Sequence, residues 1–529
     1  MLLDTDVLVI GGGLGGAWAA IKARESGGSV LWMDKAEPGN CGQSAFAAGD
    51  VDILPEDEDI DTLTGIWMRE FPLTSRTLIK ECLRQSLDRV LEMEKWGISF
   101  EKDASGKLEI KPGPGGKKRA LSIGHVMMST LRNLIESKGI QVIGHTYVSD
   151  IIVAEGKVRG AVGFNIITGE EVIISSGSVV MAAGCYGLKA NNFQGVGFLS
   201  GDSLAMGYRA GGELYNMEFL RGNTGHRDYN TVGMSKFTGA FGGRLRNARG
   251  EYFMQKYRPD AKIPDSAPFQ EFWIAMAKEV QAGRGPIFID LTGIKPEDYA
   301  LSRKMLPHLF KVLDSAGIDI RKEIMPWIPS GYRGFGGLLH DNHFQTTING
   351  LYVAGDAAGG VMLAWAIFTG YKAGKCAGEY AAGTTRLKID RELTTSLLAT
   401  AFAPLKRSGQ ITPDKVIYRI QEIMVPYKVL ILKSAASIGI AQESLEKVIA
   451  EDIPRIHAAD PHELMKANEA GSMALTSKIH LAAALLRTES RNFHYREDYP
   501  EQNDKDWLKW ICARKESKEI SFGFRPVAL

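Results

Sequence analysis

Cysteine is scarce in this sequence: five cysteines stand far apart in a chain of 529 residues, and no C-x-x-C pair occurs. The ligand patterns of zinc ribbons and iron–sulfur clusters are therefore missing, and we expect no such metal centre within the chain. An excess of charge is missing as well, because the formal net charge is +1. A general attraction to nucleic acid or to an anionic membrane is not expected at this charge.

Long apolar runs are also missing, and none reaches the ~20 residues that a membrane-spanning helix needs. The first residues, MLLDTDVLVIGGG, enter a strand pattern without a basic region or a cleavage site, so no signal peptide is expected. Apolar residues make up 44% and charged residues 24%, as in ordinary globular proteins. With dispersed thiols that we expect to stay reduced, these features predict a cytoplasmic protein.

What the sequence does contain is a glycine-rich turn close to its start. Residues 6–10 are typical of a buried parallel strand, 14–25 of a helix and 29–34 of a second strand. The turn follows G-x-G-x-x-G, in which the glycines permit a tight turn, the approach of a pyrophosphate and the packing of helix on strand. The residues that we expect to bind the nucleotide here are Gly11, Gly13, Gly15 and Gly16, with Asp34 for ribose hydroxyls and Lys35 beside it.

A second turn of the same kind follows at LYVAGDAAGG, residues 351–360. One protein needs two such turns if its cofactor is long, because FAD must be held at both ends. Gly355 and Asp356 would approach the ribityl and phosphate side. A helix beginning near Val361, with Met362 and Leu363 in its first turn, would direct its positive end at the flavin.

At this point the chain resembles the flavoprotein subunits of succinate dehydrogenase, fumarate reductase and aspartate oxidase. The matching segments are GNCGQSAFAAGD (39–50), VVMAAGCYG (179–187), SGDSLAMGYRAGGELYNMEF (200–219), GEYFMQKYRP (250–259) and LLRTESRNFHYREDYPEQND (485–504). The resemblance covers most of the chain and implies tightly bound FAD with hydride transfer at flavin N5. It adds, as cofactor-binding residues, Gly42, Gln43, Ser44, Ala48, Gly49, Asp50, Ala183, Gly184 and Asp202, to which we add Val148 from the β-rich stretch 141–184.

The sequence departs from this family where the family binds its cofactor and its dicarboxylate. Many members link FAD covalently to a histidine, whose place is taken here by Gln43, so we predict non-covalent FAD. The His-Pro-Thr expected after MEF is absent from 220–225, and Tyr332 replaces a histidine before the glycine pair. Pro268, Phe269 and Gln270 stand where the proton-donor arginine is expected, and the loop after AGDAAGG is short. These losses argue against standard succinate or fumarate chemistry.

A second branch of the superfamily, the alpha subunit of adenylylsulfate reductase, is similar at GLKANN (187–192), at GRGPIFID (283–290) and in the C-terminal run. In that subunit sulfite adds to flavin N5, and electrons arrive from a ferredoxin-like subunit. An enzyme like adenylylsulfate reductase therefore remains an alternative, as does an electron-transfer subunit that binds FAD without a substrate of its own.

Several polar residues are candidates for binding or protonating a substrate. Arg333 precedes the glycine pair and could bind an anion, with a salt bridge as the alternative; Tyr332 could relay a proton or simply pack. Arg221 and His226 lie where the family places its substrate loop, although His226 could equally be a surface residue. Asn192 could face the flavin, or its pair with Asn191 could cap a helix.

The predicted fold is α/β, with a Rossmann-like FAD-binding domain, an inserted α+β capping domain and a C-terminal helical domain. The expected parts are 1–225 and 335–384 for FAD, 226–334 for the cap, and 385–529 for the helical domain and tail. The predicted function is an FAD-dependent oxidoreductase for a small anionic or polar substrate. Electrons would be exchanged with a separate iron–sulfur subunit of ferredoxin type; reaction with oxygen and an oligomeric state are both left open.

Overall fold

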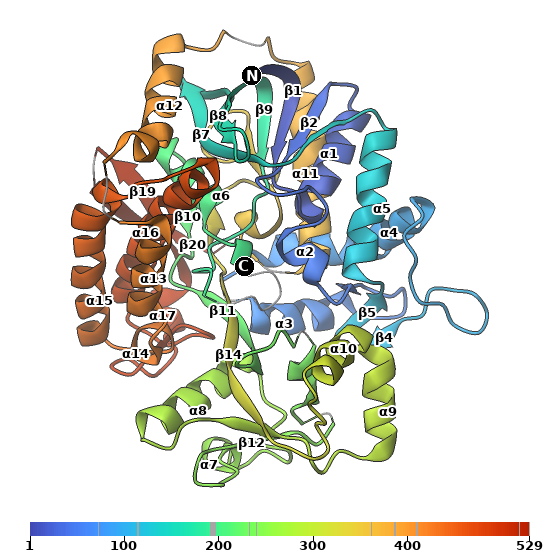
Figure 1. Cartoon of the computed structure of the whole chain (residues 1–529). Helices are drawn as coiled ribbons and strands as arrows, with labels where there is room; N and C mark the ends of the chain where they lie inside the picture. The colour runs from blue at the N-terminus through green and yellow to red at the C-terminus, as the bar shows by residue number, and fades with distance from the viewer. Residues whose placement is uncertain are drawn as a thin grey trace.

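The computed structural model describes residues 1–71, 73–113, 116–190, 197–231, 233–239, 241–360, 362–385, 388–408, 411–517 and 519–527. Figure 1 shows three parts: an α/β part around the N-terminus, a lower part made from the middle of the chain, and a helical part in orange and red. Asn191 and Asn192 lie outside the described residues, as does Val361.

The α/β part is built on a mixed sheet. In the described residues its order is β6-β2-β1-β9-β8-β7, with β16 pairing on β9. β6, β2, β1, β9 and β16 run parallel, whereas β7, β8 and β9 form antiparallel hairpins. The strands are β1 (Leu2–Ile10), β2 (Val30–Met33), β6 (Gln141–Ile143), β7 (Thr146–Ala154), β8 (Lys157–Asn165), β9 (Glu171–Met181) and β16 (Leu351–Val353). The predicted βαβ unit and β-rich stretch are thereby confirmed.

Two helices that follow the two glycine turns pack against each other on this sheet. These are α1 (Leu14–Glu25) and α11 (Leu363–Ala382). A Cβ on Gly370 would lie 2.4 Å from the carbonyl oxygen of Gly15, and one on Gly374 would lie 2.3 Å from that of Ala19. Glycines four residues apart on α11 therefore let the two helices approach more closely than any side chain would allow.

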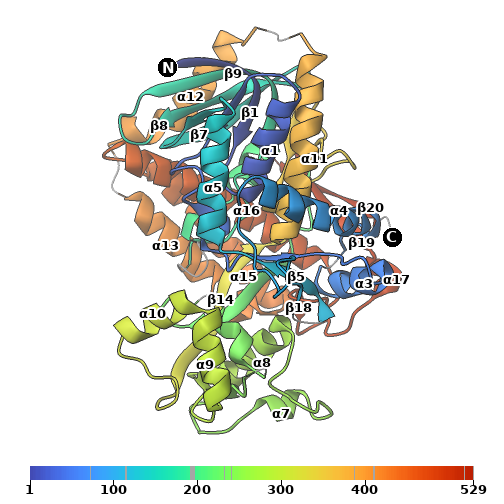
Figure 2. The same cartoon turned by 90° about the vertical axis from the view of Figure 1, so that its right-hand side faces the viewer.

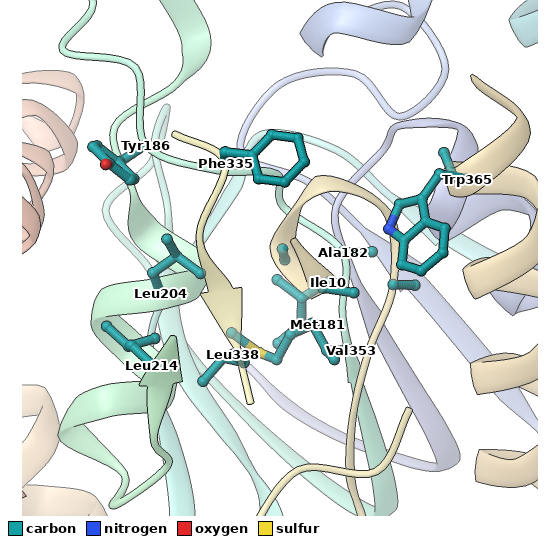
Figure 3. Close-up of a cluster of buried hydrophobic side chains, with 14 of the residues drawn as sticks. Ile10, Met181, Ala182, Tyr186, Leu204, Leu214, Phe335, Leu338, Val353 and Trp365 are labelled. Atoms are coloured by element: carbon teal, nitrogen blue, oxygen red, sulfur yellow. The ribbon is translucent and has the colours of Figure 1, made fainter. Parts of the chain in front are cut away.

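Further elements surround the sheet. The helices are α2 (Gly42–Phe46), α3 (Ile60–Glu70), α4 (Arg76–Lys95), α5 (Gly124–Ser137) and α6 (Asp202–Arg209), and a small sheet contains β3 (Asp50–Asp52), β4 (Lys111–Pro112) and β5 (Lys118–Leu121). Figure 3 shows how the parallel strands end in a buried apolar cluster, in which Ile10, Met181 and Val353 meet. Trp365 from α11 and Phe335 belong to the same cluster, so the ends of the strands are held rigidly beneath the turns.

The inserted part has its own sheet and its own core. β11 (Leu220–His226) enters it and β14 (Met325–Gly334) returns, pairing antiparallel. The other elements are β12 (Arg244–Arg246), β13 (Phe288–Asp290), η3 (Met234–Phe237), α7 (Met254–Tyr257), α8 (Phe269–Gln281), α9 (Pro296–Met305) and α10 (Pro307–Ser315). Phe237, Phe272 and Trp327 are buried in a cluster separate from the main core. The expected boundary after residue 225 falls inside β11, and the one after 334 coincides with the end of β14.

The C-terminal part is helical, as predicted, but the chain ends in a hairpin. Its elements are α12 (Arg391–Lys406), α13 (Pro413–Met424), α14 (Tyr427–Leu430), β17 (Leu432–Lys433), α15 (Ala435–Lys447), η5 (Val448–Asp452), η6 (Ile453–Arg455), α16 (Pro461–Leu486), β18 (Tyr495–Arg496) and α17 (Asp504–Trp507), whereas η4 (Gly355–Ala358) belongs to the α/β part, between β16 and α11. The hairpin β19 (Lys509–Glu516) and β20 (Glu519–Pro526) joins β10 (Leu214–Tyr215) and β15 (Gly337–Leu338) in one sheet. In the described ranges, no helix combines the length and apolar character needed to cross a membrane.

Candidate functional site

A cavity lies at the carboxyl ends of β1, β2, β9 and β16, where open parallel sheets bind their ligands. The predicted cofactor residues that line it are Gly11, Gly13, Gly15, Asp34, Lys35, Gly42, Gln43, Ser44, Ala48, Gly49, Asp50, Val148, Ala183, Gly184, Asp202, Gly355, Asp356, Met362 and Leu363. Gly16 does not line the cavity; it packs instead against the first turn, where a Cβ would lie 2.0 Å from the carbonyl oxygen of Gly11. The structure thus brings together residues that the sequence holds more than three hundred positions apart.

The first turn is locked to the strands on both sides of it. Gly11 has φ +123°, and a Cβ there would lie 2.2 Å from the carbonyl oxygen of Ala182. The backbone N–H of Gly12 donates to Asp34 Oδ2 at 2.6 Å. That of Leu14, the first residue of α1, donates to Ser44 Oγ at 3.0 Å. Asp34, directly after β2, and Ser44, on α2, therefore hold the beginning of α1 against the cavity.

The two glycine turns touch each other. A Cβ on Gly15 would lie 2.9 Å from the backbone nitrogen of Gly355, so only glycine fits at this contact. α11 begins at Leu363 with no side-chain cap and no acidic residue in its first turn, and α1 likewise has no acid there. Two helix N-termini with positive partial charge thus border one cavity, which fits an elongated pyrophosphate-containing cofactor.

Lys35 and Asp202 form a buried ionic network. Lys35 Nζ donates to Asp202 Oδ2 at 2.8 Å and to Glu469 Oε1 at 2.6 Å, and Tyr147 donates to Asp202 Oδ1 at 2.9 Å. Burial opposes charge here, yet the paired cation lowers the pKa of Asp202 to about 2, and the two carboxylates raise that of Lys35. Because Glu469 belongs to α16, this network ties the α/β part to the C-terminal helices.

Gln43, on α2, connects the second glycine turn to β14. Its amide, oriented so that both ends are satisfied, donates to Asp356 Oδ2 and accepts from Arg333 Nη1, each at 2.8 Å. Burial raises the pKa of Asp356 to about 6, against the opposing effect of Arg333. Burial, and then repulsion from Arg221, lowers the pKa of Arg333 to about 10, so Arg333 remains a cation at neutral pH.

Arg221 and Arg333 form a cross-strand pair on β11 and β14, and both line the cavity. Arg221 Nη2 is 3.5 Å from Glu70 Oε2, and its guanidinium lies 5.4 Å from the ring centroid of Phe71. Its Nη1 is buried without a hydrogen-bond partner among the described residues. Since like charges directly opposite each other repel, this pair leaves an environment suited to an anion.

Two further cations of the cavity are already neutralised. Lys117 Nζ lies 2.6 Å from Glu70 Oε2, and Arg119 contacts Asp52 at 2.8 Å and Asp50 at 2.7 Å. Although burial opposes it, Lys117 and Arg221 together lower the pKa of Glu70. Arg221, whose Nη1 has no hydrogen-bond partner among the described residues, is therefore better placed to receive an anion than Lys117 and Arg119.

Two other candidate catalytic residues do not reach the cavity. Tyr332 is buried, donates to the carbonyl oxygen of Pro329 at 2.8 Å and packs against Trp273 with ring centroids 5.4 Å apart. His226 Nδ1 accepts from the backbone N–H of Asp228 at 3.0 Å, and burial lowers its pKa. Neither side chain lines the cavity, and the third candidate, Asn192, lies outside the described residues.

Sequence reasoning missed several residues that line the cavity. These are Lys117, Arg119, Tyr147 and Asn223, among others. Phe269 is the first residue of α8, so the cavity extends from the glycine turns to the inserted part. The only sequence signal for the cations was the basic run Lys117-Lys118-Arg119, which is more often a solvated surface. Within the described ranges, no group of three or more His, Cys, Asp or Glu could hold a metal ion.

The fold and the paired turns define an α/β flavoprotein with an inserted cap. Residues 6–366 match the family described as FAD binding domain, and residues 418–529 match that described as fumarate reductase flavoprotein C-term. The chain belongs to this family, the superfamily of succinate dehydrogenase and fumarate reductase flavoprotein subunits, and is an FAD-dependent oxidoreductase.

Individual relatives agree along the whole length. One subunit of the fumarate reductase (CoM/CoB) of Methanothermobacter marburgensis is 27% identical over 564 residues, covering 99% of each chain. A quinol–fumarate reductase structure has a TM-score of 0.90 at 20% identity, covering 100% of this chain and 99% of that one. Adenylylsulfate reductase from Archaeoglobus fulgidus has a TM-score of 0.82 at 21% identity, covering 99% and 96%. At these identities the structural likeness speaks for the fold and not for the substrate.

Proposed function

We propose that this chain is the flavoprotein subunit of an oxidoreductase that binds FAD non-covalently and acts on a small anion held by Arg221 and Arg333. The observation that carries the proposal is the pair of arginines opposite each other on β11 and β14, lining the same cavity as both glycine turns. An anion between them would offset their repulsion and accept charge-assisted hydrogen bonds from both.

The proposed substrate is not bound in the way that the family binds succinate or fumarate. β11 carries Leu220–Gly225 without His-Pro-Thr, and Tyr332 turns into the core. Phe269 borders the cavity at the place where the resemblance puts the proton-donor arginine. The arginine pair beside the aromatic ring of Phe269 favours a substrate that carries one anionic group and is otherwise less polar.

Bound FAD would supply hydride transfer, or addition of a nucleophile, at its N5 atom. Gly11, Gly15 and Gly355 would admit the cofactor by keeping side chains out of the turns, and α1 and α11 would direct their positive ends at it. Gln43 would hold Arg333 in place through their 2.8 Å hydrogen bond. Phe269 and the rest of the inserted part would exclude water from the cavity.

Electrons would pass to or from a separate iron–sulfur subunit of ferredoxin type. The relatives are named as subunits, and the five cysteines of this chain are dispersed, four of them buried and Cys376 partly exposed. We favour a substrate-processing subunit over one that only transfers electrons, because the cavity continues past the glycine turns to Arg221, Asn223 and Phe269.

Anaerobic titration of the FAD-loaded protein tests the proposal. Visible flavin absorbance would be followed while small carboxylates, sulfonates and sulfite are added separately to oxidised protein and to protein reduced with dithionite. We expect one class of monoanion to perturb or bleach the flavin, and sulfite alone doing so would favour chemistry like that of adenylylsulfate reductase. If Arg333→Gln leaves the apparent Kd for that anion unchanged, or if no anion changes the spectrum, the proposal is wrong. Arg514→Gln on β19, with a side chain 57% exposed, is the matched control.

A further inference from the structure

β20 ends the sheet β15-β10-β19-β20, and in the described part of the chain no strand pairs with its outer edge. Figure 2 places the hairpin of β19 and β20 at the margin of the molecule, beside the C-terminus. The strand runs for eight residues, from Glu519 to Pro526, and only its last residue is a proline. Long open edges of this kind readily add another strand, and natural proteins usually protect them.

The hairpin geometry indicates which backbone groups face outward. Glu516 pairs with Glu519 across two residues, and Ser517 has the positive φ of 56° typical of tight hairpin turns. The pair that flanks a two-residue turn is hydrogen-bonded, and hydrogen-bonded and non-hydrogen-bonded pairs alternate from there. Ile520, Phe522 and Phe524 therefore direct their N–H and C=O groups away from β19.

The same three residues carry the apolar face of the strand. Ile520 and Phe522 are partly buried and pack against the main core, whereas Phe524 is 49% exposed. Their neighbours Glu519 and Arg525 are polar and alternate with them, as the period of a strand requires. A strand added at this edge could cover Phe524 and still leave the charged face in solvent.

We propose that a second copy of this chain pairs with β20 antiparallel, centred on Phe522, so that the two terminal sheets become one. In this register Ile520 lies opposite Phe524 of the partner subunit, and Glu519 lies opposite Arg525 of the partner subunit. All the outward backbone groups of Ile520, Phe522 and Phe524 then find partners, because none of these residues is a proline. The strand is self-complementary in shape and charge, which is what a two-fold interface needs.

Charge within the hairpin supports a second copy over an unrelated partner. Glu516 and Glu519 are directly opposite each other, and Glu516 is paired with Arg514 at 2.5 Å. Among the described residues, Glu519 has no ion pair, so the like charges across the turn are only half relieved. Arg525 is 2.8 Å from Glu213 of its own chain and has further N–H groups that could receive Glu519 of the partner subunit.

Sedimentation equilibrium of the full-length, FAD-loaded protein tests this proposal. We expect a dimer at micromolar concentration, and we expect Phe524→Lys to weaken it at least tenfold, because a charge on the edge opposes strand addition. The matched control is Tyr418→Lys, at a residue 64% exposed on α13, which should leave the dimer unchanged. A monomer at tens of micromolar, or a dimer that Phe524→Lys does not weaken, would overturn the proposal.

A cysteine substitution tests the register. Phe522 would face Phe522 of the partner subunit, with the two Cα atoms about 5.5 Å apart, within the range that a disulfide spans. With diamide as oxidant, we expect Phe522→Cys to give a covalent dimer on a non-reducing gel. Ser521→Cys should give no covalent dimer, because in this register the two Ser521 positions are not opposite each other. The unmodified protein should give none either. Equal cross-linking of both variants would show that the strands do not pair in this register, and far-ultraviolet circular dichroism and bound flavin would report whether the variants fold.

Discussion

Arg221 and Arg333 are opposite each other in the antiparallel ladder of β11 and β14, and both border the cavity. Arg221 lies 3.5 Å from Glu70, which is already bound to Lys117 at 2.6 Å. Two guanidinium groups that repel each other at the wall of a cavity are what we expect of a site that binds an anion between them.

Neutralising one member of this pair should affect stability and binding in opposite directions. We expect Arg221→Gln to stabilise the ligand-free protein by up to about 1 kcal/mol, because cross-strand like charges cost roughly that much. The same change should weaken binding of the substrate anion about 10- to 100-fold, through loss of a charge-assisted hydrogen bond. Thermal unfolding and flavin-monitored titration of one preparation measure both effects. A loss of stability together with unchanged affinity would mean that Arg221 serves only the fold.

FAD should be released intact when the protein is denatured. Gln43 occupies the place where the resemblance puts a flavin-linking histidine, and its amide is already hydrogen-bonded to Asp356 and Arg333. An amide does not form that covalent bond, so trichloroacetic acid should leave all the flavin in the supernatant and a colourless pellet. A fluorescent band on a denaturing gel would contradict this expectation. A preparation unfolded in guanidinium and passed over a desalting column is a second, independent measurement.

The parts of the site that are local in sequence could be predicted, and the parts that depend on tertiary contacts could not. Each glycine turn follows a strand pattern and precedes a helix pattern in the sequence, and a tight turn between them requires glycine. The local pattern therefore suffices to predict the roles of Gly11 and Gly355. Lys35 and Asp202 were also expected at the cavity. Their common partner Glu469, however, comes from α16, more than four hundred residues after Lys35. The sequence of α16 gives no local signal that the carboxylate of Glu469 will be buried against the α/β part.

The orientation of Tyr332 and Arg333 shows a second limit. In a regular strand, neighbouring residues point to opposite faces, and the sequence does not say which face meets the cavity. The ladder of β11 and β14 shifts between Arg221 and Asn223, and Gly331 has φ +66°. This bulge re-aims the side chains that follow it, so that Arg333 reaches the cavity and Tyr332 packs against Trp273.

The close approach of α1 and α11 should make Gly374 intolerant of even a methyl group. A Cβ at Gly374 would lie 2.3 Å from the carbonyl oxygen of Ala19, so we expect Gly374→Ala to destabilise the protein by about 1–3 kcal/mol. Gly439 in α15 offers the matched control, because a Cβ there meets nothing within 4 Å among the described residues. Gly439→Ala should stabilise by about 0.5–1 kcal/mol through helix propensity. Urea unfolding of both variants checks the contrast, and equal effects of the two substitutions would show that α1 and α11 are less tightly packed.

Lys433 should make stability depend on pH on the alkaline side. Its side chain is fully buried and donates to the carbonyl oxygen of Leu430 at 2.8 Å, and burial followed by repulsion from Arg496 lowers its pKa to about 7. Between about pH 7 and the usual lysine value near 10.4, the unfolded chain binds a proton that the folded chain does not. The free energy of unfolding therefore rises across this window by about 1.4 kcal/mol per pH unit on account of Lys433. Below about pH 7, where the buried lysine is protonated, Lys433 destabilises the folded protein most.

Replacing Lys433 by methionine, which has a similar volume and no charge, isolates this effect. We expect Lys433→Met to be more stable than the unmodified protein at pH 6.5, because a buried cation is removed at little cost in packing. The difference in unfolding free energy should shrink steadily towards pH 10, where the folded lysine is already neutral. Lys478→Met, at a residue of α16 whose side chain is 40% exposed, should show no such trend. A constant difference from pH 6.5 to pH 10 would mean that Lys433 keeps its proton in the folded protein, which would require a counter-charge close to its ammonium group.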